Sequence, residues 1–192
     1  MSVADLKSLM PLLEQSASVM EAAAFVIAAT SDRIEPLPAD VLSDPSCLVA
    51  FFGNVEPALA GSGYLGIYEE RIGDQSTNFT RRADISTVAF GDAGEAGAYV
   101  AKQIADWKRC ANKTMTVKTD SQEVTWTLND PVTARDVPVQ LHAAEGAAGY
   151  ACSRAIAARS NVVADVAACS DDNTDLIDQA AALVNLIINK IP

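Results

Sequence analysis

The segment Tyr150–Cys169, with the sequence YACSRAIAARSNVVADVAAC, decides the fold because it reads as two β-strands folded back on each other. A turn at Ser160-Asn161 would place Cys152 opposite Cys169. Opposed residues on neighbouring antiparallel strands lie close enough for a disulfide bond. In this register the other face of the hairpin is wholly apolar and consists of Ala155, Ala157, Ala164 and Val166. The segment therefore predicts an antiparallel hairpin that carries a disulfide and packs on one side.

The segment before this hairpin continues the antiparallel pattern, because apolar residues alternate with threonines on both sides of a polar turn. A turn at Ser121-Gln122 would pair Thr116 with Thr127, and on the other face it would pair Val117 with Trp126 and Met115 with Leu128. A third strand is predicted by the alternation of Val137, Val139, Leu141 and Ala143. The expected polar face of this sheet consists of Thr114, Thr116, Thr125, Thr127, Gln140 and His142.

Helical periodicity and capping residues place the remaining elements. The expected helices run from Pro11 to about Ala24, from Pro45 to Leu59, from Ala93 to Arg109 and from Leu176 to Ile191. Two further strands are expected at Tyr64–Ile72 and Asp84–Phe90. No internal repeat or low-complexity linker divides the chain, so we expect residues 1–192 to form a single domain. The expected fold class is α+β, with a central antiparallel sheet, helices packed mainly on one face and two disulfides.

Composition excludes several classes of function. The chain of 192 residues carries 25 acidic against 14 basic residues, a net charge of −11, which makes it a poor binder of nucleic-acid phosphates. One histidine and no Cys-x-x-Cys pair argue against a metal site, and the absence of a glycine-rich phosphate loop argues against a nucleotide cofactor. The longest apolar run, Ala22–Ala29, is too short to span a membrane. The first residues lack the pattern of a signal peptide.

The four cysteines predict where the protein resides. If the hairpin pairs Cys152 with Cys169, Cys47 is left with Cys110. These two are expected in the first turn of one helix and just past the end of another, which suits two helices packed side by side. The alternative is four buried free thiols in a cytosolic protein. Paired cysteines indicate an oxidising compartment, so the chain reads as an extracellular fragment or the mature portion of a longer precursor.

Few residues are candidates for chemistry or binding. His142 is the only imidazole, and a secreted hydrolase with a Ser-His-Asp arrangement would have to use it; the alternative is a hydrogen-bonded strand histidine. Arg81-Arg82 is the only basic doublet and could meet an anion, although a solvated loop explains it as well. The polar sheet face could hold a small ligand, although it could also be an ordinary wet face. Its candidate ligand-binding residues are Thr116, Thr127, Gln140 and His142.

Several runs of residues carry a family resemblance. They lie at Asp44–Cys47, Ala60–Tyr64, Ile104–Thr114, Trp126–Leu128, Tyr150–Ile156 and Asn161–Val166. Together with Cys169 and the closing helix, these runs resemble the PknH-like extracellular sensor domain of mycobacterial receptor Ser/Thr kinases, which several mycobacterial lipoproteins also carry. The resemblance extends over about Leu6–Pro192, essentially the whole chain.

The resemblance implies a function as well as a fold. It implies an α+β domain with a central antiparallel sheet, flanking helices and the disulfides Cys47–Cys110 and Cys152–Cys169. It also implies an open cleft on the extracellular side of the membrane for a small or envelope-derived ligand of unknown identity. A domain of this family is not catalytic, because any kinase would lie upstream, across a membrane-spanning segment absent from this chain. The alternative within the family is the ligand-binding domain of an envelope lipoprotein.

Overall fold

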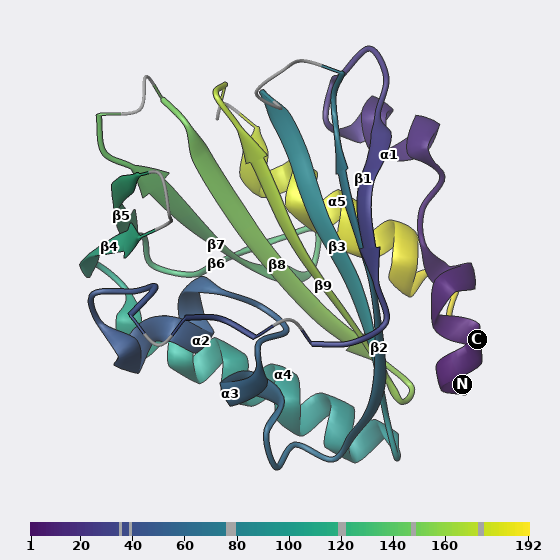
Figure 1. Cartoon of the computed structure of the whole chain (residues 1–192). Helices are drawn as coiled ribbons and strands as arrows, with labels where there is room; N and C mark the ends of the chain where they lie inside the picture. The colour runs from purple at the N-terminus through teal and green to yellow at the C-terminus, as the bar shows by residue number, and fades with distance from the viewer. Residues whose placement is uncertain (35, 39, 76–79, 119–121, 147–148, 173–174) are drawn as a thin grey trace.

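A nine-stranded antiparallel sheet forms the centre of the computed structural model, which describes residues 1–34, 36–38, 40–75, 80–118, 122–146, 149–172 and 175–192 (Figure 1). The strands follow the order β1-β2-β3-β9-β8-β7-β5-β4, and β6 pairs with β7. Their bounds are β1 (Val26–Ser31), β2 (Tyr64–Gly73), β3 (Arg81–Phe90), β4 (Thr114–Lys118), β5 (Glu123–Leu128), β6 (Val132–Ala134), β7 (Val137–Ala144), β8 (Ala151–Arg159) and β9 (Val162–Ser170). The predicted α+β class with its antiparallel sheet is confirmed.

The hairpin of β8 and β9 has the predicted register. Cys152 pairs with Cys169, Ala155 with Val166 and Ala157 with Ala164. The two cysteines form a disulfide with an S–S distance of 2.07 Å. Ser160 closes the turn in the left-handed region at φ 50°. The hairpin lies in the middle of the sheet, so its register sets which side chains of the neighbouring strands share a face.

The helical segments cover both faces of the sheet rather than mainly one. One face packs against η1 (Val3–Leu9), α1 (Leu13–Val19) and α5 (Leu176–Ile188), which share an apolar core with strand residues such as Val139, Ala155 and Val166 (Figure 1). A second core on the other face joins Val88, Ile156 and Val163 to η2 (Pro45–Cys47), α2 (Leu48–Phe51), α3 (Glu56–Leu59) and α4 (Ala93–Cys110). We call these the α5 face and the α4 face.

Two of the expected helices are shorter than the sequence pattern predicts. The segment expected as one helix from Pro45 to Leu59 forms three short pieces, because Gly53 interrupts it and Asn54 takes a left-handed φ of 44°. The helix expected from Pro11 ends at Val19, and Glu21 follows at φ 53°. The apolar run after Glu21 then enters the edge strand β1, which the sequence pattern did not predict.

The register of β4 and β5 differs by two residues from the expected one. Met115 pairs with Trp126 and Thr116 with Thr125, and the expected turn at Ser121-Gln122 begins at a residue outside the described ones. A shift of two residues keeps every side chain on its face, so Met115 and Trp126 are buried as expected. The predicted third strand is present as β7, which pairs with both β5 and β8.

Both chain ends are held at the turn between β8 and β9. The Met1 amino group donates a hydrogen bond to Asn161 Oδ1 at 2.6 Å, and Ser160 Oγ donates to the carbonyl oxygen of Pro192 at 3.1 Å. Figure 1 shows the two termini close together at one side of the molecule. Cys152 and Cys169 lie at the opposite ends of the same two strands.

A candidate ligand-binding cleft on the sheet

A cleft with a volume of about 230 Å³ lies on the α4 face of the sheet. Its floor follows from the strand register, because directly paired residues of antiparallel strands project to the same side. One row across β3, β9, β8 and β7 consists of Arg82, Cys169, Cys152 and His142. The next row, which begins on β2, consists of Arg71, Asp84, Ala167 and Arg154. The floor is therefore built from charged residues around a disulfide.

The wall of the cleft is aromatic and consists of the wall segment Phe51–Val55, which begins at the last residue of α2, together with Trp126 of β5. Phe51 stacks on the His142 ring with centroids 5.1 Å apart and meets Trp126 edge-on at 5.5 Å. Phe52 lies edge-on against Phe51 at 4.8 Å. Phe52 and its neighbours through Val55 also line the cleft. The break that shortens the expected helix thus gives the cleft its apolar side.

A buried ion pair connects the floor of the cleft to this wall. Arg154 on β8 and Asp165 on β9 are 1% and 3% exposed, and their closest nitrogen and oxygen atoms lie 2.6 Å apart. Arg154 also donates hydrogen bonds to the carbonyl oxygen of Val49 at 2.7 Å and to Gln103 Oε1 at 3.0 Å. Burial opposes the charge of Arg154, but the Asp165 carboxylate still raises its pKa.

Gly53 allows the wall to approach this ion pair closely. A Cβ atom at Gly53 would lie 2.9 Å from Asp165 Oδ2, closer than side chains normally approach. The Asn54 amide donates a hydrogen bond to Ser86 Oγ, and that hydroxyl donates in turn to the carbonyl oxygen of Asp165 at 2.9 Å. The wall therefore rests directly on the floor through polar contacts.

The four candidate ligand-binding residues do not share one face. Thr127 pairs with Ala143 and Leu128 pairs with His142, so the threonines lie on the α5 face while His142 lies on the α4 face. The expectation of one polar face with Thr116, Thr127, Gln140 and His142 is therefore wrong. Among these four residues, only His142 lines the cleft.

Gln140 and His142 are enclosed rather than exposed. Gln140 is fully buried and donates from its amide to the carbonyl oxygens of Asn129 at 2.8 Å and Trp107 at 3.2 Å. His142 is 2% exposed, and its Nε2 lies 3.4 Å from Gln140 Oε1. Burial, reinforced by the nearby positive charge of Arg154, lowers the pKa of His142 to about 3. The ring is neutral at pH 7 and serves as a stacking surface for Phe51.

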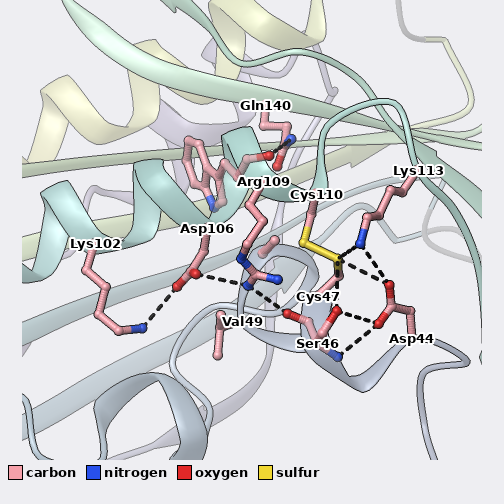
Figure 2. A network of polar contacts seen from close by, with 12 residues as sticks. Asp44, Ser46, Cys47, Val49, Lys102, Asp106, Arg109, Cys110, Lys113 and Gln140 are labelled. Atoms are coloured by element: carbon pink, nitrogen blue, oxygen red, sulfur yellow. Dashed lines mark hydrogen bonds and ion pairs between the residues drawn. A yellow bond between two sulfur atoms is a disulfide. The ribbon is translucent and has the colours of Figure 1, made fainter.

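The second disulfide, Cys47–Cys110, joins η2 to the end of α4. It thereby attaches the chain just before the wall segment Phe51–Val55 to that helix. Its S–S distance is 2.05 Å, and charged groups surround it in Figure 2. Lys113 forms an ion pair with Asp44 at 3.1 Å, and Arg109 donates to the carbonyl oxygen of Ser46 at 2.7 Å. Hydrogen bonds from Ser46 and Lys113 hold the pKa of Asp44 below its usual range. Both predicted disulfides are therefore present, and each one supports the cleft.

Sequence reasoning missed most of the residues that form the cleft. Arg154 and Asp165 could have been found, because they interrupt the apolar hairpin on the same face as the two cysteines. Phe51 and Phe52 carry no such signal, since they were expected inside a helix. Among the described residues, no cluster of three metal-ligating side chains and no helix able to cross a membrane occurs.

Comparison with known proteins connects this fold to a family. The family model described as the PknH-like extracellular domain matches residues 1–190. The serine/threonine-protein kinases PknH of Mycobacterium bovis and Mycobacterium tuberculosis are each 33% identical over 149 residues, or 78% of this chain. The chain spans about a quarter of the length of these relatives, 25% and 24% respectively.

A solved structure agrees with the sequence matches. The crystal structure of the extracellular domain of PknH from Mycobacterium tuberculosis has a TM-score of 0.91 and 28% identity, and the match covers 99% of this chain and 96% of that one. The matched region is an extracellular domain, which agrees with the compartment that the cysteines predict. On sequence and on structure alike, the chain belongs to the family of PknH-like extracellular domains.

Proposed function

We propose that residues 1–192 act as one extracellular sensor domain of a membrane-anchored Ser/Thr protein kinase and bind a small or envelope-derived ligand in the cleft. The observation that carries this proposal is the composition of the cleft, which combines an aromatic wall with a charged floor. Such a combination suits ligand binding, because apolar contacts supply affinity and a few fixed polar groups supply specificity. The kinase part of the proposal comes from the relatives, which are named as serine/threonine-protein kinases and of whose length this chain spans about a quarter.

The arrangement also suggests how a ligand would alter the domain. The wall contacts the floor through Arg154 and is fastened to α4 by the Cys47–Cys110 disulfide. A ligand lodged between wall and floor would contact both Phe52 and the strands, so it would bias the position of the wall segment. An equilibrium between two wall positions could then be shifted by differential ligand affinity.

Nuclear magnetic resonance with envelope extract tests the proposal. We expect a mycobacterial envelope extract to shift backbone resonances of Phe51–Val55 and of β8 and β9 near the disulfide. Phe52→Ala removes part of the wall from a half-buried position and should abolish these shifts. The matched control is Leu65→Ala, because Leu65 is 63% exposed and does not line the cleft. Unchanged shifts in Phe52→Ala, or shifts confined to other regions, would contradict a ligand site in the cleft.

A second measurement concerns the parent protein. In a full-length receptor kinase carrying this domain, Phe52→Ala should change autophosphorylation in response to the extract, whereas Leu65→Ala should not. If the native gene product instead carries a lipid-anchored cysteine and no kinase, the same cleft would serve an envelope lipoprotein.

A further inference from the structure

The basic doublet Arg81-Arg82 is divided between the two faces of the sheet. Successive residues of a strand point to opposite faces, and both arginines lie in β3. Arg81 donates to the carbonyl oxygen of Glu21 at 2.8 Å and lies 3.7 Å from the carboxylate of Asp172. Arg82 lines the cleft, in the same row as Cys169, Cys152 and His142. Only the second arginine of the doublet therefore faces the candidate ligand site.

Most charges in the cleft are compensated within the protein. Asp165 pairs with Arg154, and Asp84 pairs with Arg71 at 2.6 Å. Glu69, the third acidic residue of the lining, has a partner of its own. The described part of the chain offers no carboxylate ion pair to Arg82. Arg71 and Arg154 each pair with a carboxylate of the lining, and Arg82 is the lining arginine for which the described residues show no such pair.

Part of the Arg82 guanidinium lacks a hydrogen-bond partner in the part of the chain that the structure describes. Its Nε atom is buried and has no hydrogen-bond partner among the described residues. A buried donor without a partner costs free energy that a bound acceptor would recover. Elsewhere on its guanidinium, Arg82 hydrogen-bonds to the hydroxyl of Tyr150. Burial raises the pKa of Tyr150, so this hydroxyl stays neutral and supplies no countercharge. A guanidinium in this state favours the forked geometry of a carboxylate or phosphate.

We propose that the cleft binds an elongated amphiphilic acid, whose carboxylate or phosphate group is held by Arg82 and whose apolar part packs on Phe51, Phe52 and Trp126. This inference rests on the proposed function of the cleft as a ligand site. Arg82 and His142 are separated by three strand spacings of about 4.8 Å, so the ligand spans about 14 Å between its acid group and the ring wall.

Three probe compounds with the same body and different head groups test this inference. They are 6-phenylhexanoate, its neutral amide and 6-phenylhexylammonium, whose lengths approach the span of the cleft. We expect the acid to bind about tenfold more tightly than the amide, and the ammonium compound to bind least. Arg82→Gln should remove the preference for the acid, and Arg82→Lys should restore part of it. Arg81→Gln is the matched control and should leave the preference intact.

Calorimetry would measure the affinities, and NMR shifts of the cleft residues would locate the binding. Equal affinities for acid and amide in the unmodified protein, or a preference that survives Arg82→Gln, would overturn the anion site while the cleft remained a ligand site. If none of the three compounds shifts the cleft resonances at millimolar concentration, the anion site is also overturned. The ligand-sensing role would then depend on the envelope-extract experiment alone. Melting temperatures of the variants confirm that each one folds.

Discussion

Arg154 forms hydrogen bonds that connect the floor of the cleft to α2 and to α4. Its guanidinium contacts Asp165, Gln103 and the main chain of Val49, and it is almost fully enclosed. Asp165→Asn would leave a buried positive charge without its countercharge and should lower the free energy of unfolding by about 3–5 kcal/mol. The double variant Arg154→Met/Asp165→Leu should recover most of that loss. Urea unfolding measures both, and a double variant as unstable as Asp165→Asn would contradict this account.

His142 makes the stability of the domain sensitive to mild acid. The unfolded pKa of histidine is about 6.5, and the folded pKa of His142 is about 3. The folded state therefore binds fewer protons between these values. Its stability is fully present above about pH 6.5 and falls by about 1.4 kcal/mol per pH unit as the pH drops toward 3. Denaturant unfolding between pH 7 and pH 4.5 should show this slope.

Because the chain has a single histidine, a change in stability between pH 6.5 and 5 can be assigned to His142. No second imidazole titrates in the same window, and the lowered pKa values of Asp5, Asp44, Asp106 and Asp178 affect stability mainly below about pH 5. His142→Gln keeps a neutral polar side chain and should flatten the slope between pH 6 and 4.5. Parallel pH profiles for the variant and the unmodified protein would show that another group is responsible.

At the scale of elements, the two disulfides should differ in what they stabilise. They close loops with sequence separations of 63 and 17 residues, for which chain entropy gives about 4 and 3 kcal/mol. Replacing Cys47 and Cys110 by serine should therefore cost slightly more stability than replacing Cys152 and Cys169. It should also speed hydrogen exchange in the wall segment, because the segment loses its attachment to α4. Equal exchange rates in the wall of both double variants would contradict that attachment.

The elements also show what local sequence can and cannot predict. The β8–β9 register can be predicted from the hairpin sequence alone, because the register that pairs the two cysteines also places the apolar residues together on the other face. The β4–β5 register does not, since a shift of two residues preserves the same alternation. The break at Gly53-Asn54 has an explanation only in three dimensions, where Gly53 must fit beside Asp165. That contact joins residues far apart in the sequence, and the cleft wall depends on it.

At the scale of the whole molecule, the sheet separates two apolar cores. Leu183 lies in the core of the α5 face, and Leu59 lies in the core of the α4 face. Each leucine is fully buried, so each substitution by alanine should cost about 2–5 kcal/mol. Because the two sites share no core, the costs should add within about 0.5 kcal/mol in the double variant. A larger deviation in urea unfolding would show that the two cores are coupled through the sheet.

The location of the cleft on the whole molecule was partly predictable. A polar sheet face near His142 was expected, and His142 does line the cleft. The error was to place Thr116 and Thr127 beside it, because β5 pairs with β7 in a register that sets Leu128 opposite His142. Pairing between separate hairpins depends on the tertiary structure, and periodicity within one strand carries no information about it.

The two termini lie together at one end of the β8–β9 hairpin, and the Cys152–Cys169 disulfide in the floor of the cleft lies at its other end. Met1 and Pro192 are held at the Ser160-Asn161 turn, and the cleft row with Cys152 lies about 25 Å away along β8. A membrane tether attached to either terminus would therefore extend from the end of the domain that lies away from the Cys152 row of the cleft. The cleft would then point outward from the lipid surface, and a ligand could enter from the surrounding envelope without passing beneath the domain.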